Sequence, residues 1–153
     1  METILKDVIL ETTSSSLQDI RPKKRKGKRE KDHLFVNENK QMIYYAEIKS
    51  NLNLDTEKCK TTALKCLQIQ SELQLEYPKY EIKMFLLGSR YLFREQIPLR
   101  ILSKYHLIKN HVMGVNDYFG ELGVAFQFEG EMQYVQFLNQ IVEHMFDPSS
   151  FSQ

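Results

Sequence analysis

Residues 42–49, Met42-Ile-Tyr-Tyr-Ala-Glu-Ile-Lys49, are an apolar run that ends in a carboxylate and an ammonium. If the run forms a strand, its side chains alternate between the two faces of a sheet. Ile43, Tyr45, Glu47 and Lys49 would then share one face. The stretch therefore predicts a strand that carries two opposite charges side by side near its carboxyl end.

A second short stretch, Asp32-His-Leu-Phe-Val-Asn37, precedes this run. The polar residues 38–41 between them can form a turn, which would pair the two stretches as a hairpin. Asp32 would then approach Glu47 and Lys49. Two carboxylates offer the hard oxygen ligands that Mg²⁺ prefers, and a lysine beside them can orient or stabilise a nucleophile or a phosphate.

The residues after Lys49 predict a βαβ unit. In the polar segment 50–57, Asp55 or Thr56 can cap a helix that runs to about residue 76 and stops before a proline. Residues 82–87 are a nearly continuous apolar run, typical of a strand that is buried on both faces. The two strands should be parallel and joined by a right-handed crossover.

The rest of the chain completes one expected α/β domain over residues 1–153, with a mixed central sheet of four or five strands flanked by helices. The apolar stripe of the last helix, which includes Met132 and Val135, should pack on the sheet. The further expected elements are a helix over 3–11, an extended segment around 17–21, a short helix or strand over 98–107, a strand over 124–128 and an amphipathic helix over 131–146.

The net charge of the 153 residues is only +1, but eight basic residues are concentrated between Arg21 and Lys31. This basic loop could be an arm that contacts DNA phosphates, a nuclear-import signal or a solvated loop. The arm is favoured because the loop directly precedes Asp32. Its expected DNA-binding residues are Lys23, Lys24, Arg25, Lys26, Lys28, Arg29 and Lys31.

Several classes of protein are disfavoured by the sequence. Cys59 and Cys66 lie two helical turns apart, and the four histidines do not join them in the spacing of a zinc site, so both cysteines are expected to be reduced. No stretch approaches the roughly 18 apolar residues of a membrane span. The amino terminus carries Glu2, Lys6 and Asp7 where a signal peptide is apolar, so a cytoplasmic protein is expected.

The pattern Glu-x-Lys occurs three times, at 38–40, 47–49 and 81–83, so the pattern alone is weak. Only Glu47 closes an apolar strand just before a helix amino terminus, where open α/β sheets place their ligands. Asp32 on the neighbouring stretch is a second, independent requirement. We therefore favour a catalytic role for Asp32, Glu47 and Lys49 over a solvated strand.

The stretches Lys31-Asp-His-Leu-Phe35, Tyr44-Tyr-Ala-Glu-Ile-Lys49 and 50–58 resemble the catalytic segment of type II restriction endonucleases of the PD-(D/E)xK superfamily. The resemblance covers about residues 31–87, and it departs from the superfamily at Lys31, where many members have proline. It implies that Asp32 and Glu47 bind Mg²⁺ and that Lys49 assists the attacking water. The backbone carbonyl of Ile48 and the carboxylate of Glu11, on the leading helix, could add metal ligands.

The expected function is therefore Mg²⁺-dependent hydrolysis of double-stranded DNA by a type II restriction endonuclease. One site cuts one strand, so a homodimer or a heterodimer with a larger subunit is expected. Asn51, Asn53 and Lys58 are expected to contact DNA, although helix capping also accounts for part of this cluster. The alternatives are a structure-specific or repair nuclease of the same superfamily, and a non-enzymatic nucleic-acid-binding protein.

Overall fold

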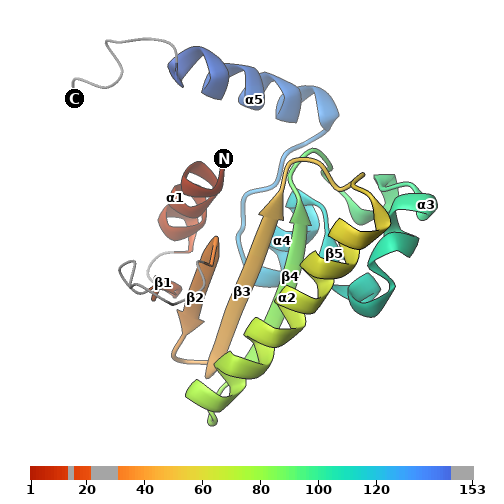
Figure 1. Cartoon of the computed structure of the whole chain (residues 1–153). Coiled ribbons are helices and arrows are strands. Elements are labelled where there is room, and N and C mark those ends of the chain that lie inside the picture. The colour runs from red at the N-terminus through yellow and green to blue at the C-terminus, as the bar shows by residue number, and fades with distance from the viewer. Residues whose placement is uncertain (14–15, 22–30, 146–153) are drawn as a thin grey trace.

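The computed structural model describes residues 1–13, 16–21 and 31–145 (Figure 1). Six of the basic residues assigned above to a DNA arm, those between positions 23 and 29, lie outside the described residues. The side chains of residues 141–145 are also left undescribed.

A five-stranded mixed sheet forms the centre of the molecule, with strand order β1-β2-β3-β4-β5. β1 pairs with β2 and β2 with β3 in antiparallel fashion, whereas β3, β4 and β5 are parallel. This arrangement confirms the predicted α/β fold. The strands are β1 (Gln18–Asp19), β2 (His33–Asn37), β3 (Met42–Lys49), β4 (Glu81–Gly88) and β5 (Val112–Met113).

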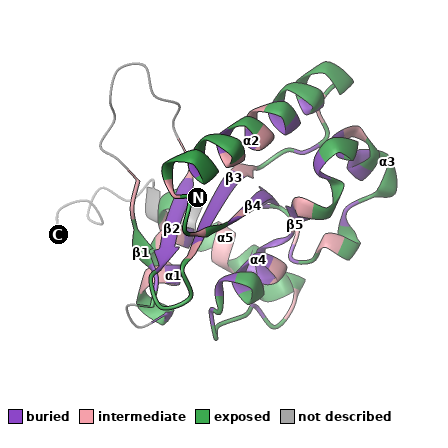
Figure 2. Ribbon diagram, turned by 90° about the horizontal axis from the view of Figure 1, so that it is seen from below, coloured by how far each residue is buried: buried purple, intermediate pink, exposed green. Residues whose placement is uncertain are grey.

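Helices cover both faces of the sheet (Figure 2). The long helix α2 packs on one face together with the 3-10 helix η2, and α1 and α4 pack on the other. None of the described helices is long and apolar enough to cross a membrane. The helices are α1 (Glu2–Thr12), α2 (Thr56–Glu76), η1 (Arg94–Gln96), α3 (Leu99–Leu102), η2 (Ser103–His111), α4 (Val115–Leu122) and α5 (Glu131–Met145).

β3 is a central strand with apolar neighbours on both faces. Ile43 and Tyr45 join the cluster under α2, whereas Tyr44 and Ala46 join the cluster under α1 and α4. Because strand side chains alternate, Glu47 belongs to the α2 side of the sheet. The alternation that was expected from the sequence is thus present. It directs the Glu47 side chain to the α2 side of the sheet.

The predicted βαβ unit is confirmed. Asp55 caps α2 by accepting a hydrogen bond from the Lys58 N–H at 2.9 Å. β4 then runs parallel to β3, with Gly88 opposite Lys49. A Cβ atom at Gly88 would lie 2.6 Å from Leu52, so glycine lets the segment that leaves β3 pass close to β4. The crossover packs α2 against β4, on the side of the sheet to which Glu47 belongs.

The predicted strand over 124–128 is wrong. The N–H and C=O of Phe128 bond instead to the side chain of Asn116 on α4, at 3.0 and 2.9 Å, so this segment pairs with a side chain and not with the sheet. Residues 112–113 form β5, and residues 115–122 form α4. Residues 98–107 are helical, divided between α3 and η2.

α5 has nearly the predicted bounds, and Leu138 of its predicted apolar stripe packs on the core, but Met132 and Val135 of that stripe do not. Met132 is 80% exposed and Val135 is 46% exposed. The buried side chain is Tyr134, whose hydroxyl donates to the carbonyl of Ser89 and whose ring packs on Phe128. This aromatic contact sets the rotation of α5, which lies beyond the carboxyl ends of β3 and β4 in Figure 1.

Candidate active site

The candidate site lies at the end of the sheet where β2 begins and β3 ends. The hairpin register pairs His33 with Ala46, which places Asp32 level with Glu47 on the neighbouring strand. The Oδ2 atom of Asp32 accepts a hydrogen bond from the Ile48 N–H at 2.8 Å. This bond holds the Asp32 carboxylate against the backbone next to Glu47.

Glu47 is a buried carboxylate, only 5% exposed. Its Oε2 atom accepts a hydrogen bond from the Tyr45 hydroxyl at 3.1 Å, and its Oε1 atom lies 3.0 Å from the Lys65 ammonium of α2. Burial raises the pKa of Tyr45, and the nearby Cys66 and the negative charge of Glu47 raise it further, so Tyr45 stays protonated as a donor. The arrangement orients both oxygens of Glu47.

The carboxylate of Asp32 faces Glu2 in the first turn of α1. A side-chain hydrogen bond to Asp32, burial and the negative charge of Asp32 raise the pKa of Glu2 to about 7. Arg21 lies nearby and donates to the carbonyl oxygen of Asp32 at 3.0 Å. Glu2 is therefore readily protonated beside the Asp32 carboxylate, at a place where a bound cation could replace that proton.

His33 holds the amino terminus of α1 at this site. Its ring nitrogens lie 2.7 Å from the Tyr118 hydroxyl and 2.7 Å from the backbone oxygen of Glu2. Burial lowers the pKa of His33 to about 4, so the ring is neutral. His33 thus has a structural role, because it ties the first turn of α1 to α4.

The same contact decides which acid of α1 reaches Asp32. The structure brings Glu2 to it, whereas Glu11, named above as a further ligand, is exposed at the other end of the helix. Nine residues of α-helix span about 14 Å. The expected position of Glu11 near the site is therefore wrong, and the acid of α1 beside Asp32 is Glu2.

Lys49 lies on the α2 side of the sheet, like Glu47. Burial raises the pKa of the Cys66 thiol on α2 to about 12, and the positive charge of Lys49 opposes that rise, which places the ammonium near this face. Within the described part of the chain, Lys49 forms no ion pair. Its charge is available to an anion at the end of β3.

The polar cluster after β3 is largely engaged in local bonds. The Asn51 side chain accepts from the Asn53 N–H at 3.0 Å, and the Asn53 side chain accepts from Lys104 at 3.2 Å. Lys58 is exposed and lies 3.8 Å from Asp55. These bonds shape the turn and the start of α2, and they leave the Lys58 ammonium open to solvent.

The oxygen donors at this strand end are of the type that a Mg²⁺ site with few protein ligands uses. Asp32 and Glu47 supply two carboxylates, and the Ile48 carbonyl is a third hard oxygen at the same strand end. Among the described residues, no three side chains of His, Cys, Asp or Glu converge as a metal cluster. Mg²⁺ commonly takes one or two carboxylates and keeps several waters, so this set suffices.

A family model for the type II restriction endonuclease HinfI matches residues 2–139. The match spans the hairpin, the βαβ unit and most of α5, and it contains every residue of the site described above. The chain belongs to the HinfI family of type II restriction endonucleases. The curated proteins and the solved structures contain no match to it.

As a HinfI-family member, the chain is a type II site-specific deoxyribonuclease and part of a restriction system. Its substrate class is accordingly DNA. The family match begins at Glu2, so it includes the α1 carboxylate that meets Asp32 as well as the Glu47 and Lys49 pair. Fold and family therefore agree on the class of enzyme that was expected from the sequence.

Sequence reasoning missed two charged residues at this end of the HinfI-family fold, Glu2 and Lys65. No local signal marks Glu2, because its place depends on the distant contact with His33. Lys65 did carry a signal. It lies three residues after Thr62 and four before Ile69, both on the buried face of α2, so it borders that face.

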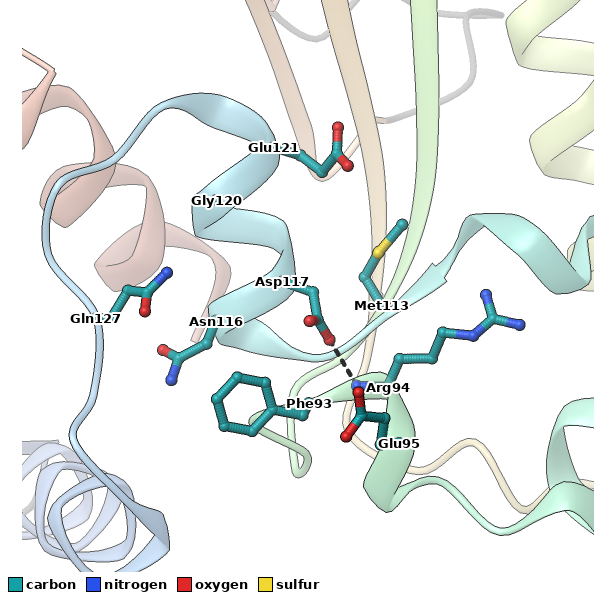
Figure 3. A pocket seen from close by; sticks show the side chains of 9 residues that line it. All are labelled: Phe93, Arg94, Glu95, Met113, Asn116, Asp117, Gly120, Glu121 and Gln127. Carbon is teal, nitrogen blue, oxygen red and sulfur yellow. Dashed lines mark hydrogen bonds between the residues drawn. The ribbon is translucent and has the colours of Figure 1, made fainter.

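An open pocket of about 410 Å³ lies elsewhere, between residues 93–95 and α4 (Figure 3). Two of its three acidic groups, Asp117 and Glu121, are already engaged. Asp117 accepts from the backbone N–H groups of Arg94 at 2.5 Å and Gly114 at 3.3 Å, and Glu121 lies 3.5 Å from Lys83. This pocket contains none of the predicted site residues, and its polar contacts fasten α4 to the preceding loop.

Proposed function

We propose that this HinfI-family enzyme hydrolyses double-stranded DNA with Mg²⁺ held by Asp32 and Glu47, and that Lys49 assists the attacking water. The observation that carries the proposal is the hydrogen bond from the Ile48 N–H to Asp32, which fixes this carboxylate beside the buried Glu47. Two carboxylates at one sheet end supply the hard oxygen ligands that a shared divalent cation needs.

Each residue of the proposed site has a distinct task. Mg²⁺, when bound, polarises the phosphate and activates a water. Asp32 and Glu47 hold the ion, and the Ile48 carbonyl is available as a further ligand. Tyr45 keeps the Glu47 carboxylate oriented. Lys49 adds a positive charge near the phosphate without competing for the metal.

Glu2 replaces Glu11 as the proposed carboxylate of the leading helix. It is the leading-helix carboxylate that touches Asp32, so it can bind the same ion directly or through water. The backbone contact with His33 fixes its helix terminus. We therefore include Glu2, and leave out Glu11, in the proposed metal surroundings.

The DNA-contacting surface is proposed to include Lys31 and the basic residues between 23 and 29, because they directly precede Asp32. Asn51, Asn53 and Lys58 border the other side of the strand end. A double-strand break requires a second site. We propose a homodimer, or a heterodimer with a larger subunit, as the cutting form.

Cleavage of plasmid DNA tests the proposed function. The protein should cut it into discrete fragments with Mg²⁺, and EDTA should abolish cutting until excess Mg²⁺ is restored, because the two carboxylates are proposed to work through the ion. Nicks at fixed positions would indicate a lone subunit of a heterodimer. Fragments that form equally well in EDTA, or no cutting of any DNA, would contradict the proposal.

A further inference from the structure

Lys65 on α2 is a second lysine at the proposed metal site, outside the Glu-x-Lys pattern. Its Nζ atom lies 3.0 Å from Oε1 of Glu47. The two partners differ in environment, because the Lys65 side chain is 35% exposed and that of Glu47 only 7%. The ammonium therefore lies at the boundary between the buried carboxylate and solvent.

In the metal-free protein this ion pair has a clear electrostatic role. A buried carboxylate without a nearby positive charge is strongly destabilising, and Lys65 supplies that charge to Glu47. A divalent cation on the same carboxylate would supply it instead. Two cations on one carboxylate repel each other, so metal binding would weaken the hold of Glu47 on Lys65.

Among the described residues, the lining of the concavity next to Lys65 includes no acid. This open concavity of about 450 Å³ is lined among the described residues by Thr61, Leu64, Lys65 and Gln68. None of these four is acidic. The Thr61 hydroxyl already donates to the backbone carbonyl of Glu57, and the Gln68 amide donates to the Glu72 carboxylate. An ammonium released from Glu47 would face solvent, where an incoming anion can reach it.

A phosphate on the same ion would come within reach. Mg²⁺–oxygen bonds are about 2.1 Å long, so a phosphate oxygen on an ion held by Glu47 lies within about 4 Å of the Glu47 oxygen. Lys65 is already 3.0 Å from that carboxylate. A small movement of its long side chain would exchange one oxygen partner for the other.

We propose that Lys65 contacts the substrate, exchanging Glu47 for a phosphate oxygen of the DNA once a divalent cation occupies the site. The inference rests on the proposed function and adds a residue to it. Lys65 and Lys49 would approach the phosphate from α2 and from β3 respectively. DNA affinity would thus depend on Lys65 when the metal is bound and much less without it.

The test measures DNA binding by Lys65→Met, with Lys60→Met as the matched control. Lys60 is an exposed lysine of the same helix that contacts no site residue. The probe is a short duplex that contains the sequence at which the wild-type protein cuts plasmid DNA. Fluorescence anisotropy is recorded over a range of salt concentrations, with Ca²⁺ in place of Mg²⁺ and separately with EDTA.

Lys65→Met should bind about tenfold more weakly than wild type in Ca²⁺, as expected for loss of one charge-assisted phosphate contact. The slope of log affinity against log salt should fall by about one. In EDTA the variant should bind within about twofold of wild type, and Lys60→Met should do so in both conditions. Lys65→Gln, which can still hydrogen-bond to Glu47, should behave like Lys65→Met and guards against misfolding.

Equal losses in Ca²⁺ and EDTA, or no loss in Ca²⁺, would overturn the role of Lys65 and leave it as a counter-ion of Glu47. In that case wild-type cleavage would be unaffected, so the proposed nuclease function would stand. A wild-type protein that neither binds nor cuts DNA would instead overturn the proposed function itself.

Discussion

Replacing Glu47 with glutamine should lower the single-turnover rate of DNA cleavage by on the order of a thousandfold or more. Glutamine nearly matches glutamate in shape but lacks the charge that holds the ion. The Tyr45 hydroxyl can bond to the amide oxygen, and the partly exposed Lys65 can turn to solvent. The variant should therefore fold and still bind DNA in Ca²⁺, which separates loss of chemistry from loss of structure.

Glu81→Gln is the matched control for this variant. Glu81 begins the same Glu-x-Lys spacing, but it is exposed and pairs with Met42 at the opposite end of the sheet from Glu47. It should cut DNA at the wild-type rate. A Glu47→Gln enzyme that cuts normally, or an equal loss in Glu81→Gln, would show that the position of Glu47 has no special part in catalysis.

Lys49→Met should reduce the single-turnover rate at saturating Mg²⁺ by about 10²- to 10⁴-fold, the range typical of a group that assists proton transfer in the transition state. Lys49 is proposed to act on the water and not on the metal. The Mg²⁺ concentration that gives half the maximal rate should therefore stay close to the wild-type value.

The control is Lys83→Met, which removes the lysine of the corresponding pattern on β4. The ion pair of Lys83 with Glu121 is about 36–40% exposed and contributes little to stability. This variant should be fully active. If Lys49→Met regained the wild-type rate simply on addition of more Mg²⁺, Lys49 would serve metal or DNA binding, and its proposed part in the chemical step would be wrong.

The parts of the fold that the sequence predicted well are those fixed by neighbouring residues. The apolar run before Lys49 forms β3, Asp55 caps α2, and the apolar run after Pro78 forms β4. The pairing of Asp32 with this unit also followed, because a short polar turn leaves a hairpin few alternative registers. Local signals therefore placed both acids of the candidate site at one sheet end.

The parts that the sequence did not predict depend on contacts between distant segments. The Asn116 side chain hydrogen-bonds to both the N–H and the C=O of Phe128, so the strand expected there does not form. The hydrogen bond from Tyr134 to Ser89, the residue after β4, rotates α5 so that Met132 and Val135 are exposed. His33 likewise selects Glu2 over Glu11. Such contacts can be identified only in the folded structure, because no periodicity along the chain indicates them.

Iron-directed cleavage of the protein backbone tests most directly whether Asp32 and Glu47 share one metal ion. Fe²⁺ loaded in place of Mg²⁺, with ascorbate and peroxide, produces radicals that cut the polypeptide close to the bound ion. We expect cuts near Asp32 and near Glu47 in the same sample, suppressed by excess Mg²⁺ and lost in Glu47→Gln. Cuts at only one of the two segments, or cuts that Mg²⁺ does not suppress, would contradict a shared metal site.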